Sequence, residues 1–86
     1  MAEESLVVKL KNGLHARPAT EFVKSASSFT CEITVTKGTK RVNAKSIMGI
    51  LSLGIASGEE ITLAANGTDE LNALAVLKQM ITNEEE

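Results

Sequence analysis

The chain has 86 residues, of which 43% are hydrophobic and 23% are charged, a balance typical of one globular domain with a modest core. A formal net charge of −2, with two phenylalanines as the sole aromatic residues, excludes the basic and aromatic surface of a nucleic-acid-binding domain, so we expect no direct contact with nucleic acid. One cysteine and one histidine exclude an internal disulfide and a clustered metal site.

The first half of the chain predicts a strand, a helix and a hairpin. Alternating apolar residues predict a strand over 5–10, and helical spacing predicts an amphipathic helix over 16–27. Residues 31–36 alternate again, 37–40 form a turn, and 41–44 form a short return strand. The residues expected to face the core of this half are Leu6, Val8, Leu10, Ala19, Phe22, Val23, Ala26, Cys31, Ile33 and Val35.

The second half predicts a helix, a strand and a last helix. The short helix of 46–54 begins with a serine, a good helix cap, and ends at a glycine. Residues 59–65 alternate as a strand, and 66–68 turn the chain. We expect Thr68 to cap the last helix, with Asp69 and Glu70 in its first turn. Its predicted apolar stripe is Leu71, Leu74, Ala75, Leu77 and Ile81, and the tail of 83–86 is expected to fray.

The resulting order is strand, helix, strand, strand, helix, strand, helix in a single domain over 1–86. Each strand has one apolar face, which indicates an antiparallel or mixed sheet covered by helices on one side, an open-faced α+β sandwich. The acidic start and short apolar runs indicate neither a signal peptide nor a membrane span. We therefore expect a cytoplasmic protein without membrane insertion, a monomer that needs no metal and no cofactor.

The stretch NGLHARPAT, residues 12–20, carries the one histidine and the one proline of the chain. If the helix begins at residue 16, His15 precedes it, and the free N–H groups of Ala16 and Arg17 point toward the ring. Pro18 has no N–H and is tolerated in a first turn. Amide donors, the positive helix end and the Arg17 guanidinium together favour a phosphoryl group on the ring.

Other interpretations of His15 compete with this one. An exposed histidine near a helix start is commonly a plain surface residue. A general base needs a substrate pocket that so short a chain does not suggest, and a metal site lacks further ligands. A covalent phosphoryl intermediate needs only exposure, an anion cradle and partner proteins.

The whole chain, from about residue 4 to residue 82, resembles the HPr family, the histidine-containing phosphocarriers of the bacterial phosphoenolpyruvate-dependent sugar phosphotransferase system. GLHARPA looks like its active-site motif and VNAKSIMGILSLGI like its second signature, in the form typical of Gram-positive bacteria. The resemblance implies a four-stranded antiparallel sheet with three helices on one face, in the order βαββαβα. It also implies a carrier that is a substrate of enzymes and not an enzyme itself.

The resemblance assigns roles to two residues of the first motif. It implies that His15 accepts phosphate on Nδ1 from phosphorylated enzyme I and passes it to the A domain of a sugar permease. Arg17 would balance the charge of the phosphoryl group as it arrives and leaves. A labile P–N bond suits a group that is to be passed on, so the protein has only to position it.

Ser46 stands at the start of the short helix, where serine is a preferred cap. A phosphate there would lie at the positive helix end and would change the charge of any docking surface around it. The resemblance implies that HPr kinase/phosphorylase phosphorylates Ser46 with ATP. The serine-phosphorylated form would then be a poor phosphate acceptor at the histidine and a corepressor for the catabolite control transcription factor.

The short helix carries more apolar residues than one buried stripe needs. Ile50, Leu53 and Ile55 are expected in the core, whereas other apolar residues of the helix lie partly outside and mark a partner surface. In the family, this helix and the first one dock on enzyme I, the permease domain and the kinase. The residues assigned to that surface are Ala16, Thr20, Lys24, Ile47, Met48 and Leu51. Leu51 stands where methionine is common in the group, which puts partner affinity in question.

Three other functions remain as alternatives. One is a purely regulatory binding protein, like the catabolite-repression paralogues that keep the serine site and lack the active histidine, and His15 argues against it. Another is a carrier of a nitrogen-related phosphotransferase branch, which the segment KSIMGI disfavours. A small RNA-binding α+β domain is opposed by the charge and by the lack of aromatic residues.

Overall fold

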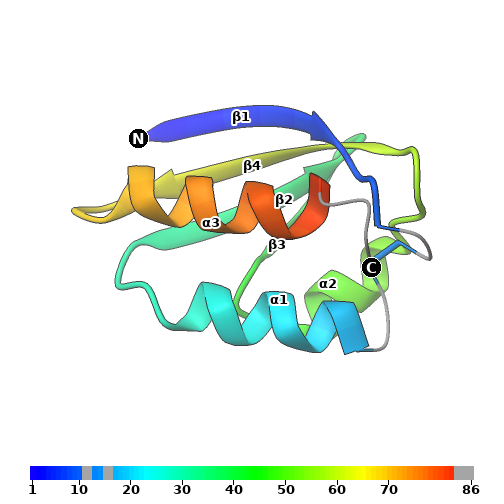
Figure 1. Ribbon diagram of the computed structural model, residues 1–86, viewed down its shortest axis with the longest axis horizontal. Helices are drawn as coiled ribbons and strands as arrows, with labels where there is room; N and C mark the ends of the chain where they lie inside the picture. The colour runs from blue at the N-terminus through cyan, green and yellow to red at the C-terminus, as the bar shows by residue number, and fades with distance from the viewer. Residues whose placement is uncertain (11–12, 15–16, 83–86) are drawn as a thin grey trace.

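The structure is a computed structural model that describes residues 1–10, 13–14 and 17–82. Its strands and helices alternate in the expected order (Figure 1). They are β1 (Ala2–Val7), α1 (Arg17–Ser27), β2 (Glu32–Lys37), β3 (Lys40–Asn43), α2 (Ile47–Leu53), β4 (Glu60–Asn66) and α3 (Glu70–Thr82). The predicted fold is therefore confirmed in its elements and in their sequence.

The strands form one four-stranded sheet in the order β1-β4-β2-β3, with every neighbouring pair antiparallel. Alternate strand residues are buried, which places the core on one face of the sheet. The helices lie in a layer along that face, with α1 and α2 beside each other and α3 against β1 and β4 (Figure 1). The other face carries hydroxyl side chains. Two of them, Ser5 on β1 and Thr62 on β4, form a hydrogen bond of 3.0 Å. The open-faced α+β sandwich is confirmed.

The core is entirely apolar among the residues that the structure describes. Its largest fully buried side chains come from the three helices, from β2 and β4, and from residues next to these elements, namely Val8, Leu14, Cys31 and Ile55. Of the residues expected inside in the first half of the chain, Leu10 and Val23 are only partly buried and the others are buried. The alternation and helical spacing of the sequence thus identify nearly all of the buried face.

The first strand differs from its predicted range of 5–10. β1 pairs with β4 from Ala2 opposite Ala65 to Val7 opposite Glu60. It ends there because the Lys9 N–H is taken by Ile81 O, at 2.7 Å, at the end of α3. The start was missed because residues 2–5 are mostly polar and are held by backbone pairing, which alternation does not report.

The last helix also differs from its prediction. It begins at Glu70, so Asp69 lies before the helix. The Asp69 carboxylate accepts hydrogen bonds from the N–H groups of Thr30 and Cys31, at 2.9 and 3.0 Å. Thr68 makes no capping hydrogen bond, and Glu70 Oε1 instead accepts the Gly67 N–H at 3.0 Å. Leu71 and Ala75 were wrongly placed on the buried stripe, since Leu71 is 72% exposed. The buried residues are Ala73, Leu74, Leu77 and Ile81.

The difference between the predicted and the observed buried side of α3 has a physical cause. Leucine and alanine occur on more than one side of the helix, so spacing alone does not decide which side is buried. Packing on β1 and β4 selects the side of Ala73 and Leu77.

The return strand differs from its prediction by one residue at each end, since it is observed over 40–43. The expected fraying of 83–86 lies outside the described residues, and no helix among the described residues is long and apolar enough to cross a bilayer.

Candidate functional site

The first helix begins at Arg17, directly after positions 15 and 16. His15 and Ala16 themselves lie outside the described residues, so their predicted roles stay predictions. Arg17 is exposed and makes no ion pair with a described carboxylate, and the first turn of α1 holds no acidic residue. A positive helix end with an exposed guanidinium and no competing carboxylate favours a dianion at this end of α1.

The segment that leads into this helix end is packed against the loop after α2. Gly13 has a φ of 77°, and a Cβ added there would lie 2.4 Å from Ile55 O and 2.8 Å from Ala56 Cα. The Leu14 N–H donates to Ile55 O at 3.0 Å, and the Leu14 side chain is only 1% exposed. The segment before position 15 is thus anchored by a buried side chain and by a close backbone contact. The sequence did not predict this contact, because it joins segments that are far apart in the chain.

Ser46 caps α2, as predicted. Its backbone is extended, at φ −113° and ψ 115°, and its Oγ accepts the Gly49 N–H at 3.1 Å. Its carbonyl accepts the Ile50 N–H at 3.0 Å, which closes the first turn. The helix ends at Gly54 in the left-handed conformation, where the Gly54 N–H donates to Leu51 O at 3.2 Å. The hydroxyl is therefore at the positive end of a short, well-capped helix.

The glycine inside this helix has a structural reason. A Cβ at Gly49 would approach the Val42 Cβ to 3.1 Å, so the missing side chain lets α2 lie close to β3. The N–H of Gly49 is also the group that Ser46 caps. The helix tolerates a poor helix former because packing and capping both use that position.

The expected partner surface is exposed or partly exposed where the structure describes it. Met48 is 75% exposed and Leu51 44%, while Ile47 is half-buried. Thr20 and Lys24 are exposed on α1, which packs beside α2 (Figure 1). The core residues of α2 and the following loop, Ile50, Leu53 and Ile55, are buried as predicted. Exposed apolar groups on α2, beside exposed polar groups on α1, are typical of a protein-binding surface.

The single thiol is not part of this site. Cys31 is buried, as predicted, and burial together with a hydrogen bond from the thiol to Asp69 raises its pKa. A protonated, buried thiol is a poor nucleophile. Within the described ranges, no three His, Cys, Asp or Glu side chains gather as a metal-binding group.

Comparison with known proteins identifies the family. The model of the PTS-HPr family, described as the PTS HPr component phosphorylation site, matches residues 2–83. The HPr-like protein Crh of Halalkalibacterium halodurans is 52% identical over 84 residues, which cover 98% of this chain and 100% of that protein.

Solved structures agree with this assignment. The crystal structure of HPr from Thermoanaerobacter tengcongensis superposes with a TM-score of 0.94 at 49% identity, covering 98% of this chain and 94% of that one. Crh of Bacillus subtilis, described as a catabolite repression protein and a dimer with a swapped domain, gives a TM-score of 0.78 at 46% identity, covering 98% and 97%. With nearly its whole length matched by the family model, the chain belongs to the HPr family of the phosphotransferase system.

Proposed function

We propose that the protein is a phosphocarrier that accepts a phosphoryl group on His15 from phosphorylated enzyme I and passes it to the A domains of sugar-specific permeases. The observation that carries this proposal is the motif GLHARPA at the start of α1, in a chain of the HPr family. Arg17 is exposed at that helix end with no carboxylate in the first turn to neutralise it. The helix end therefore attracts a dianionic group without a competing anion.

The transfer needs little from the protein beyond position and charge. The unprotonated nitrogen of the neutral His15 ring, Nδ1 in the family, forms a bond to phosphorus with its lone pair. The bond between phosphorus and the donor breaks, and its electron pair leaves with the donor. Arg17 and the N–H groups of the first turn stabilise the charge on the phosphoryl oxygens. The chain ends each cycle unchanged, as a carrier and not a stand-alone enzyme, and the step requires no cofactor.

We further propose that Ser46 is a regulatory site, phosphorylated with ATP by HPr kinase/phosphorylase. A phosphate on Oγ would stay at the positive end of α2, where the fold tolerates it. It would also add negative charge beside Ile47 and Met48 of the partner surface. This change would weaken docking on enzyme I and create the form read by the catabolite control transcription factor. Both kinds of phosphoryl transfer imply a cytoplasmic location.

A purely regulatory role is the second candidate. It is favoured by one observation, the 52% identity to a relative named Crh. His15, with Arg17 and Pro18 after it, favours the carrier role instead. We propose a monomer as the carrier form, since the described core closes within one chain. The swapped dimer of Crh is the alternative, which sedimentation at working concentration distinguishes.

The test is intact-mass measurement after incubation with phosphoenolpyruvate and enzyme I, in parallel with ATP and HPr kinase. We expect an acid-labile phosphate in the first reaction, missing in His15→Ala, and an acid-stable one in the second, missing in Ser46→Ala. We also expect Ser46→Asp to slow the first reaction. A phosphate that forms with ATP alone would reject the carrier and leave the regulator.

A further inference from the structure

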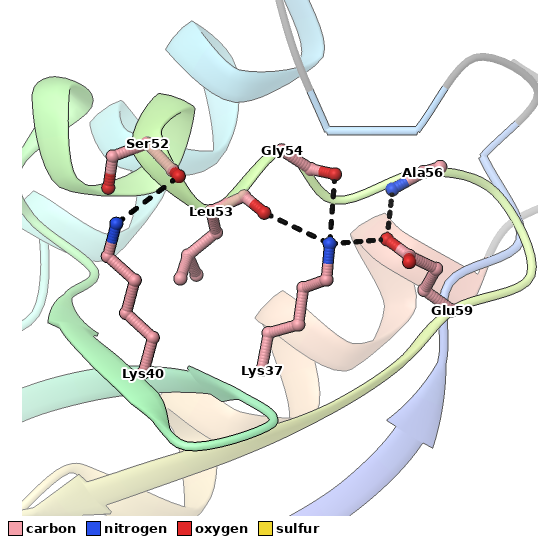
Figure 2. Close-up of polar contacts among 7 residues, drawn as sticks. All are labelled: Lys37, Lys40, Ser52, Leu53, Gly54, Ala56 and Glu59. Atoms are coloured by element: carbon pink, nitrogen blue, oxygen red, sulfur yellow. Dashed lines mark hydrogen bonds and ion pairs between the residues drawn. The ribbon is translucent and has the colours of Figure 1, made fainter.

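The loop between α2 and β4 is held by one lysine from the hairpin below it (Figure 2). Lys37 Nζ donates to Leu53 O at 3.0 Å and to Gly54 O at 3.1 Å. It also forms an ion pair with Glu59 Oε1 at 2.9 Å. A lysine ammonium has three N–H donors, and here all three have an acceptor. Lys37 thus ties the end of α2 to the far end of the loop.

Glu59 closes the same loop from its other side. Its Oε1 accepts the Ala56 N–H at 2.8 Å (Figure 2). Its own N–H donates to Ala56 O at 3.1 Å. The hydrogen bond from Lys37, followed by the one from the Ala56 N–H, lowers the pKa of Glu59. The carboxylate is therefore charged at neutral pH, and one oxygen connects the lysine to the backbone of Ala56.

Lys37 and Glu59 together are here called the clamp. Residues 55 and 56 lie in the loop that the clamp holds, and they contact the segment before His15. Ile55 O accepts the Leu14 N–H at 3.0 Å, and Gly13 lies so close to Ile55 and Ala56 that a Cβ has no room. The far end of the loop has its own anchor, from the Gly58 N–H to Val8 O at 2.8 Å. Among the described side chains, Lys37 holds the two ends of the loop together, and Glu59 holds Ala56 in its middle.

We propose that Lys37 and Glu59 are positioning residues for phosphoryl transfer at His15, acting through Ile55 and Leu14. The inference rests on the proposed carrier function. Residue 15 follows Leu14 directly, so a shift of Ile55 O is passed to the reacting residue through one hydrogen bond and one peptide unit. A displacement of about 1 Å is able to cost up to about 100-fold in rate. Because the buried side chains of Leu14 and Ile55 limit the shift, we expect a loss of about 3- to 10-fold.

The chain offers a matched control on the same hairpin. Lys40 loses the same charge when replaced, but its Nζ contacts Ser52 O at 3.4 Å and does not contact the loop (Figure 2). The experiment compares Lys37→Met with Lys40→Met in phosphoryl transfer from enzyme I, with kcat and KM measured separately. Glu59→Ala tests the clamp from its other side, and Glu59→Gln replaces the carboxylate oxygen by an amide oxygen that still accepts the Ala56 N–H. Both clamp residues are partly exposed, so the variants are expected to fold.

We expect kcat of Lys37→Met to be at least about threefold below that of Lys40→Met, with KM of both within about twofold of the wild type. KM is expected to change little because none of these substitutions replaces a docking residue on α1 or α2. Glu59→Ala is expected to lower kcat likewise and Glu59→Gln to restore it. Amide hydrogen exchange of Leu14 and Ala56 is expected to quicken in Lys37→Met and not in Lys40→Met.

The outcomes separate this inference from the function on which it rests. A wild-type protein that takes no phosphate from enzyme I would reject the carrier function, and the inference with it. A phosphorylated wild type in which Lys37→Met and Lys40→Met differ by less than threefold in kcat would overturn the inference alone. A loss carried by KM would overturn it too, since that result would make Lys37 a docking residue.

Discussion

Replacing Gly13 by alanine tests how the segment before His15 is held. The residue has a φ of 77°, and a left-handed backbone costs a residue with a Cβ about 1–2 kcal/mol. The new Cβ would also lie 2.4 Å from Ile55 O, so the neighbours must separate by at least 0.6 Å to reach the 3.0 Å that real contacts respect. Overpacking of this kind costs about 1–3 kcal/mol more. We therefore expect Gly13→Ala to lower the free energy of unfolding by about 2–5 kcal/mol.

Gly38→Ala is the matched control. Gly38 has a φ of 63° but nothing within 4 Å of an added Cβ, so it carries the backbone cost without the clash. The change in the unfolded chain is the same in both variants. With a slope of about 1 kcal/mol per M, the clash separates their urea midpoints by about 1–3 M. Equal midpoints would refute the close contact between Gly13 and the Ile55 carbonyl, and with it the anchoring of this segment.

Three further predictions concern the helix cap, an acidic side chain and the exposed surface. Ser46→Ala is expected to cost about 1 kcal/mol of unfolding free energy in urea titrations, because the Gly49 N–H loses its acceptor. Ser52→Ala removes an exposed hydroxyl that donates to Gly49 O but caps no helix N–H, and an equal cost in the two variants would contradict the cap. The Thr30 N–H, followed by the Cys31 side chain, lowers the pKa of Asp69, so its contribution to stability is full above the unfolded value of 3.8 and is lost as pH falls through the folded one. Urea midpoints at about pH 5 and pH 3 should accordingly differ more in the wild type than in Asp69→Asn, and equal differences would refute this contribution. Met48→Ser is expected to raise KM with enzyme I and to change stability by less than about 0.5 kcal/mol, and an unchanged KM would remove Met48 from the partner surface.

The features predicted correctly are those that neighbouring residues decide. A cap serine followed by an apolar run and a glycine defined α2, because capping hydrogen bonds join residues three or four apart. Alternation identified the inward residues of β2 and β4, since strand side chains point to opposite faces in turn. The exposure of Met48 and Leu51 followed from an excess of apolar residues on one short helix. The phosphate site at His15 stays a prediction, and it too rests on chemistry that lies within a few residues.

Contacts between distant segments were decided by the tertiary structure alone. The polar start of β1 is a strand because β4 pairs with it, and the buried side of α3 was selected by the sheet beneath. Asp69 was expected to serve its own helix, yet its carboxylate binds the N–H groups of Thr30 and Cys31, 39 and 38 residues away. The clamp of Lys37 and Glu59, like the need for glycine at position 13, exists only once the loop after α2 has been folded against its neighbours. Hydrogen-bond partners brought together by chain folding leave no periodic signal in the sequence, whereas caps, turns and buried faces do.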